Sequence, residues 1–88
     1  MRSQTLMLKA GAMSGTYLTR SDVSCNMSRF YRMEVQPDLF DGWTLWREWG
    51  RIGRRGQLRL DPYQSEQDGY AALTDLVRQK MRRGYQQA

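Results

Sequence analysis

Arginine, tryptophan and glycine are concentrated in residues 43–60, and together these residue types favour contact with an anionic ligand. The guanidinium group of arginine is a planar set of N–H donors that fits phosphate, and glycine lets the backbone approach a ligand closely. The segment holds a single acidic residue, Glu48. Its arginines are Arg47, Arg51, Arg54, Arg55 and Arg59, its tryptophans Trp43, Trp46 and Trp49, and its glycines Gly50, Gly53 and Gly56. We interpret the segment as a hairpin that binds phosphate; the alternative is an ordinary hairpin with a solvated tip.

The charge of the whole chain agrees with an anionic partner. Its 88 residues include 14 lysines and arginines against nine acidic residues, which gives a formal net charge of +5. Only Lys9 and Lys80 are lysines, so the other cations are all arginines. Arginine favours bidentate and stacked contacts to phosphate or carboxylate, which makes nucleic acid a candidate partner. A compositional preference for arginine would explain the same count without any partner.

Residues typical of catalytic and metal sites are scarce. The chain has no histidine and a single cysteine, Cys25, which argues against a histidine-based triad, a zinc site and an internal disulfide. The acidic residues are spread along the chain, and neither a Walker-type loop nor a dinucleotide-binding motif is found. We therefore expect a protein that is not an enzyme and that uses no cofactor and no metal.

The N-terminal residues give little indication of structure. Leu6-Met7-Leu8 is too short for a membrane span or for the core of a signal peptide, so we expect a cytoplasmic protein with no membrane partner. Residues 1–15 lack sustained periodicity and are predicted to be a poorly ordered extension. Residues 16–88 are predicted to form a single domain.

Alternating apolar and polar residues predict a short strand over 16–24, a turn at 26–28 and a clearer strand over 29–35. Side chains two apart in a strand share a face, so the apolar set of each strand should face the core. The residues expected there are Tyr17 or Leu18 in the first strand and Tyr31, Met33 and Val35 in the second, with Phe30 partly covered.

A hairpin should follow, with a turn at Asp41-Gly42, a strand over 43–49, a glycine-rich connection, and a strand over 57–60. Both faces of the first strand carry aromatic residues, so its phase is ambiguous. We expect Trp43 and Trp46 to be buried and leave Trp49 open. In the second strand we expect Leu58 and Leu60 to point inward, and Gln57, Arg59 and Asp61 outward.

One amphipathic helix is predicted over 65–83, with Ser65 as its N-cap and Gly84 as its C-terminal stop. Its apolar stripe comprises Tyr70, Leu73, Leu76, Val77 and Met81. The expected fold class is α+β: a small antiparallel sheet of about four strands with this C-terminal helix packed across it.

Trp49-Gly50-Arg51 resembles the signature of the WGR domain family, which is named for these three residues. The similarity includes Arg29-Phe30-Tyr31 upstream, Ile52-Gly53 and Gly56-Gln57 after the signature, and the run from Lys80 to Tyr85. The resemblance implies a small antiparallel sheet with a packed helix. WGR domains of DNA-damage-dependent poly(ADP-ribose) polymerases engage DNA near strand breaks, so it also implies DNA, including strand ends, as the partner.

The resemblance suggests roles for individual residues. It implies that Trp49 lies against a sugar at a DNA terminus, that Arg51 contacts phosphate or a neighbouring protein domain, and that Arg54 reaches backbone phosphate. In some polymerase relatives, an asparagine directly before the basic–aromatic–tyrosine run is used near a 5′ end of DNA. This chain has Ser28 at that position, and Asn26 lies two residues earlier. The chain lacks the ADP-ribosyl transferase domain, so that activity is not implied. The candidate nucleic-acid-binding residues are Trp49, Arg51, Arg54, Arg55, Arg29 and Asn26.

Two functions from different classes remain open. The first is a nucleic-acid-binding module that grips the DNA backbone or DNA ends with little sequence specificity. The second is a protein–protein interaction module that acts through the Trp-Gly-Arg hairpin, with Arg51 against a carboxylate of another domain.

Overall fold

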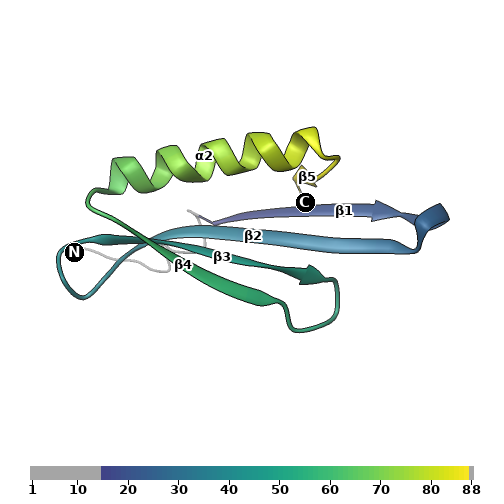
Figure 1. Cartoon of the computed structure of the whole chain (residues 1–88), viewed down its shortest axis with the longest axis horizontal. Helices are drawn as coiled ribbons and strands as arrows, with labels where there is room; N and C mark the ends of the chain where they lie inside the picture. Colours follow the sequence, from purple (N-terminus) through teal and green to yellow (C-terminus); the bar gives the residue numbers. More distant parts are fainter. Residues whose placement is uncertain (1–14, 88) are drawn as a thin grey trace.

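A five-stranded antiparallel sheet with one helix on one face forms the described part of the chain, residues 15–87 of a computed structural model (Figure 1). The strands lie in the order β4-β3-β2-β1-β5. Their bounds are Thr16–Asp22 for β1, Met27–Pro37 for β2, Trp43–Arg51 for β3, Gln57–Tyr63 for β4 and Gln86–Gln87 for β5. The α+β class and the packed helix are confirmed; the fifth strand, two residues long, was not predicted. Of the extension predicted for residues 1–15, all but Gly15 lie outside the described residues.

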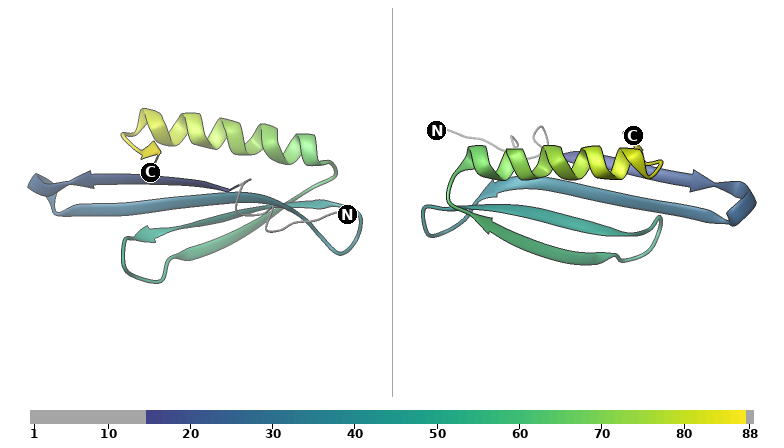
Figure 2. Two further views of the ribbon diagram at one scale, coloured as in Figure 1. Left: turned by 180° about the vertical axis from the view of Figure 1, so that it is seen from behind. Right: turned by 45° about the horizontal axis from the view of Figure 1, so that its top comes forward.

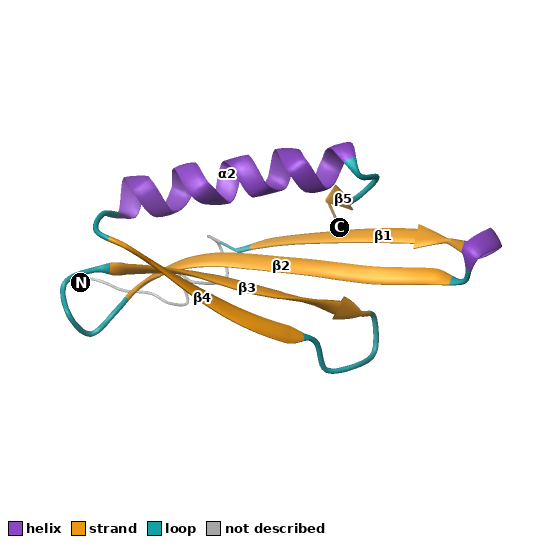
Figure 3. Cartoon of the chain, in the orientation of Figure 1, coloured by secondary structure: helices purple, strands orange, loops and turns teal. Residues whose placement is uncertain are grey.

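The core lies between the sheet and helix α2, Glu66–Arg82, which runs across one face of the sheet (Figures 2 and 3). Leu18 of β1, Met33 of β2 and Leu45 of β3 are fully buried, and Leu73 of the helix is nearly so. Tyr31 and Val35 complete the buried cluster, as their alternation in β2 predicted.

Helix α2 begins and ends close to the residues predicted from the sequence. The hydroxyl of Ser65 accepts a hydrogen bond from the N–H of Asp68 at 3.0 Å, which confirms the predicted N-cap. At the other end Gly84 has a φ of +97°, a conformation that glycine adopts without strain. The last residue of α2 that faces the sheet is Lys80. Met81 was predicted to belong to the apolar stripe of the helix, but it is 49% exposed.

The connection between β1 and β2 comes earlier than predicted. A short 3-10 turn, η1, covers Val23–Cys25, and β2 already begins at Met27. The turn is closed by Asp22, whose carboxylate accepts from the N–H of Ser24 at 3.0 Å. Asn26 follows with a φ of 50°, a left-handed conformation that asparagine tolerates better than most residues.

The structure resolves the choice between Tyr17 and Leu18 as the inward residue of the first strand. Leu18 is the inward residue, and Tyr17 lies on the opposite face, where its ring stacks on Phe30 with centroids 6.0 Å apart. Phe30 is only 8% exposed, so it is more deeply buried than expected. The cause is its cover by Tyr17 and by Gly56, since a Cβ at Gly56 would lie 3.0 Å from the Phe30 ring.

The predicted phase of β4 was wrong. Leu58 and Leu60 are 55% and 50% exposed on the face away from the helix, and Asp61 points to the helix side. Cross-strand partners share a face, and the register pairs Leu45 with Asp61 and Trp46 with Leu60. Trp46 therefore also lies on the uncovered face, 38% exposed, contrary to prediction. Trp43, expected to be buried, is partly buried and packs against the core.

Candidate nucleic-acid interface

The loop between β3 and β4 holds its arginines on a tightly closed hairpin. A Cβ at Gly56 would lie 2.3 Å from the carbonyl oxygen of Trp49, and one at Gly50 would lie 2.9 Å from the Cα of Gly56. These two glycines therefore let the strands approach where the loop begins and ends. Arg51 at the end of β3 is exposed, as are Arg54 and Arg55 in the loop.

The start of β2 and the residue before it support the loop. The N–H of Ile52 donates to the carbonyl oxygen of Ser28 at 3.0 Å. A guanidinium nitrogen of Arg51 donates to the carbonyl oxygen of Asn26 at 3.4 Å. Asn26 thus contacts the Trp-Gly-Arg segment through its backbone, and its own side chain is exposed.

Three arginines form a row across three neighbouring strands. In the register of the sheet, Arg20 of β1 is opposite Arg29 of β2, and Arg29 is opposite Arg51 of β3. Like charges in directly opposed positions repel each other. The row lies below the C-terminal end of α2, where a Cβ at Gly84 would be 3.2 Å from the Nε atom of Arg20.

Two adjoining cavities of about 370 Å³ each lie along this row, and we call them together the basic groove. They share Arg29, Trp49 and Tyr85. Among residues 15–87, no carboxylate lines either cavity. The cations of the basic groove are Arg20, Arg29, Arg47, Arg51, Arg55, Lys80 and Arg83. Within residues 15–87, Arg47 is the only one of these seven that lies within ion-pair distance of a carboxylate.

Aromatic rings make up the floor of the basic groove. Trp49 stacks on Tyr31 with centroids 5.5 Å apart and planes within 10°, and Tyr85 meets Tyr31 edge-on at 6.4 Å. Tyr85 is placed by the chain reversal at Gly84 and by the pairing of β5 with β1. Trp49 remains partly exposed, so its ring is fixed on one side and can meet a ligand on the other.

Lys80 is held over this aromatic floor. Its ammonium nitrogen lies 4.4 Å from the centre of the Tyr31 ring, within the range of a cation–π interaction. The pKa of Lys80 is lowered, first by burial and then by the positive charges of Arg83 and Arg47. An anion bound beside it would reverse this penalty on the charged form.

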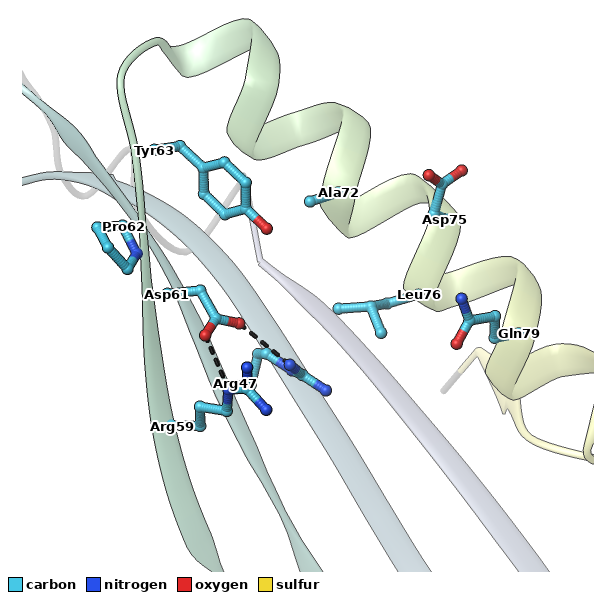
Figure 4. Close-up of a pocket in the computed structure, with 9 residues that line it drawn as sticks. All are labelled: Arg47, Arg59, Asp61, Pro62, Tyr63, Ala72, Asp75, Leu76 and Gln79. Carbon is cyan, nitrogen blue, oxygen red and sulfur yellow. Dashed lines mark hydrogen bonds and ion pairs between the residues drawn. The ribbon is translucent and has the colours of Figure 1, made fainter.

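Arg47 joins the basic groove to a third cavity, of about 460 Å³, between α2 and β4 (Figure 4). Its guanidinium donates to the Tyr31 hydroxyl and to Asp61, both at 3.0 Å. Asp61 also accepts from Arg59 at 2.7 Å. Burial alone would raise the pKa of Asp61, but the hydrogen bonds from Arg59 and Arg47 outweigh it and hold that pKa below its ordinary value. Because Asp61 and Asp75 both line this third cavity, it suits an anion less well than the basic groove does.

The candidate residues named from the sequence fall into two groups. Trp49, Arg51, Arg55 and Arg29 line the basic groove, whereas Arg54 is exposed on the loop and Asn26 on the β1–β2 turn. Sequence reasoning missed four cations of the groove: Arg20, Arg47, Lys80 and Arg83. The helical period did contain a signal for Lys80, which lies four residues after Leu76 on the inward stripe. Nothing local marks Arg20, because its place opposite Arg29 depends on the strand register.

No helix within residues 15–87 is long and apolar enough to cross a membrane. In the same residues, no three or more cysteine, aspartate or glutamate side chains gather closely enough to hold a metal ion.

Comparison with known proteins identifies the family. The family model described as WGR domain matches residues 14–88. A protein of Sinorhizobium fredii (strain NBRC 101917 / NGR234), described as uncharacterized protein y4dW, is 45% identical over 69 residues, which cover 78% of this chain. The aligned region is 34% of that relative, so the chain spans about a third of its length. No solved structure gives a significant match. The chain belongs to the WGR domain family.

Proposed function

We propose that this protein is a nucleic-acid-binding module that takes the phosphate backbone of DNA into the basic groove. The observation that carries the proposal is the row of like charges formed by Arg20, Arg29 and Arg51. Of the residues that the structure describes, none with a carboxylate lines the cavities along this row. The sugar–phosphate backbone of DNA carries closely spaced negative charges. Bound along the row, these charges would attract the arginines and offset the repulsion between them.

The lining of the basic groove supports binding with little sequence specificity. Its charged donors are guanidinium and ammonium groups, which fit phosphate oxygens and carry no sequence information when they contact the backbone. Trp49 and Tyr85 add partly exposed rings that would pack against a sugar or a base. The family resemblance extends the proposal to DNA ends, with Trp49 against the terminal sugar and Arg54 on a nearby phosphate.

Fluorescence anisotropy with a labelled duplex that carries a 5′-phosphorylated end tests this proposal. Intact duplex and single-stranded DNA serve as competitors, and the titration is repeated at several salt concentrations. Arg29→Gln and Trp49→Ala should each weaken binding about tenfold or more, as expected for loss of one charge-assisted or stacking contact. Absence of binding at low salt would overturn the proposal.

Arg32→Gln is the matched control for Arg29→Gln. Arg32 belongs to the same strand but lies on the face away from the helix, where it pairs with Glu48. Removal of either arginine changes the net charge equally, so a groove contact predicts a larger loss for Arg29→Gln. Equal losses would mean that only overall charge matters and would count against the groove.

A protein-interaction function through the same hairpin is the second candidate. It is favoured by Ile52, a large apolar residue that is 40% exposed directly after Arg51. Here Arg51 would pair with a carboxylate of another domain. Crosslinking from a photoreactive group at position 52 separates the two functions: a single protein adduct that DNA does not displace supports this candidate, and an adduct with DNA supports the first.

A further inference from the structure

Strand β4 is an edge of the sheet, and among residues 15–87 no strand lies on its outer side. Pro62 indicates which backbone groups of β4 face outward. It stands opposite Thr44 in the ladder but has no N–H to donate to β3, so its nitrogen faces away from the sheet. Backbone groups alternate in direction along a strand, so the N–H and C=O groups of Leu58 and Leu60 face outward as well.

The side chains of these residues form an exposed apolar strip. Leu58 and Leu60 lie on the face that α2 does not cover, and Trp46 is the cross-strand partner of Leu60. All three are at least 38% exposed. An edge strand with outward backbone groups and an apolar face is a template for pairing with another strand.

The sequence of β4 is complementary to itself in one antiparallel register. When two copies of the strand are paired about Leu60, Leu60 faces its equivalent and Leu58 faces Pro62 on the apolar face. On the other face, Arg59 of each copy stands opposite Asp61 of the second copy. Shifting the centre to Arg59 would instead oppose two arginines, which is unfavourable. Of these two registers, the charges favour the one centred on Leu60.

Arg59 can make this contact without leaving its own partner. It donates through Nε to Asp61 of its own chain at 2.7 Å, and its side chain is 61% exposed. A guanidinium carries five N–H donors, so its remaining donors are available to a second carboxylate.

We propose that two copies of this chain pair through β4, antiparallel about Leu60, and join their sheets into one. Four main-chain hydrogen bonds would form: two between the paired Leu60 residues, and two from Leu58 N–H groups to Pro62 carbonyl oxygens. The strip of Leu58, Leu60 and Trp46 meets its equivalent across the joint. The dimer carries two basic grooves on one joined sheet, which would raise its avidity for a long polyanion.

Analytical ultracentrifugation over a wide range of protein concentration tests the proposal. The wild-type chain should sediment increasingly as a dimer as concentration rises. Leu60→Lys should remain a monomer at every concentration, because it would place two like charges together at the centre of the joint. Val23→Lys is the matched control, since it adds the same charge at a fully exposed apolar residue far along the chain, and it should dimerise like the wild type. A wild-type chain that stays monomeric, or a Leu60→Lys variant that dimerises equally, would overturn the proposal.

Disulfide trapping tests the register itself. Cys25 is exposed and is first replaced by serine. In that background Leu60→Cys should give a disulfide-linked dimer on mild oxidation, because opposed Cα atoms in a hydrogen-bonded pair lie about 5.5 Å apart. Leu58→Cys should not, because its two copies would be four residues out of register, roughly 13 Å apart. Equal crosslinking of both variants would contradict the register. None of these results depends on DNA binding, so the dimer and the proposed function stand or fall separately.

Discussion

Arg29 of β2 stands directly opposite Arg51 of β3, and both side chains line the same cavity beside Trp49. The two arginines stand opposite each other although their like charges repel. Arg20 of β1 stands opposite Arg29 in turn, so the row of arginines crosses three strands. Solvent exposure of Arg29 and Arg51 weakens the repulsion but does not remove it. A surface selected for stability alone would not favour this arrangement, so a ligand that neutralises the row gives it a physical reason.

Arg29→Gln should raise the stability of the free protein while it weakens DNA binding. Removing the central charge relieves both cross-strand repulsions, which predicts a gain of about 0.2–1 kcal/mol in the free energy of unfolding. Urea denaturation at low salt measures the gain, which should shrink as salt is added. Arg32→Gln, which removes an ion pair from the opposite face, should show no such gain. A loss of stability in Arg29→Gln would argue against repulsion within the row.

DNA affinity should fall steeply as salt concentration rises. If about five or six phosphates are contacted, the logarithm of the association constant should fall with the logarithm of salt concentration with a slope near −5. Arg51→Gln and Arg54→Gln should each reduce that slope by about one unit, equally for DNA of any sequence. Titrations at four or more salt concentrations give the slopes. An unchanged slope in both variants would remove the hairpin arginines from the contact.

The sequence allowed the helix and β2 to be predicted in detail because their signals are local. Ser65, Gly84 and the alternation of Tyr31, Met33 and Val35 each act within a few residues of chain. The predicted phase of β4 is wrong because apolar character does not by itself mean burial: Leu58 and Leu60 are exposed. Asp61 occupies the helix side instead, since two arginines pair with it there.

Several residues that line the basic groove were suggested by the Trp-Gly-Arg signature, whereas others depend on how distant elements pack. Trp49, Arg51 and Arg55 are near neighbours in the sequence. Arg20 and Lys80 come from β1 and α2, and only the packing of these elements brings them to the same cavity. Register and helix placement are long-range properties, so no local pattern in one sequence contains them.

Gly56→Ala should destabilise the hairpin by about 1–3 kcal/mol, the usual effect of forcing extra volume into a closed site. The new Cβ would lie 2.3 Å from the Trp49 carbonyl oxygen, a backbone atom that cannot move without opening β3 and β4. Gly53→Asn is the comparison variant: no atom lies within 4 Å of a Cβ there, so any loss of stability in it reflects backbone strain at a φ of +88° and not a clash. Thermal unfolding measures both variants. A Gly56→Ala melting temperature equal to that of the wild type would show that the loop closes in another way.

Asp61 should make stability sensitive to acid. Its pKa in the folded protein is depressed below the ordinary 3.8, because the hydrogen bonds from Arg59 and Arg47 outweigh the effect of burial. The ionised carboxylate therefore stabilises the fold, fully above about pH 4, and this contribution is lost as the pH falls through the folded-state pKa. Asp61→Asn should lower the free energy of unfolding at neutral pH by about 1–3 kcal/mol and flatten its decline below pH 4.

Asp75→Asn is the control: the Asp75 carboxylate is 70% exposed and 3.9 Å from Arg78, so this change should leave the free energy of unfolding and its decline with acid unchanged. Urea denaturation at a series of pH values gives the comparison. Some decline will persist in both variants, because hydrogen bonds from Ser24 also depress the pKa of Asp22. An Asp61→Asn profile parallel to that of the wild type would mean that the pairing of Asp61 with Arg47 and Arg59 contributes nothing to acid sensitivity.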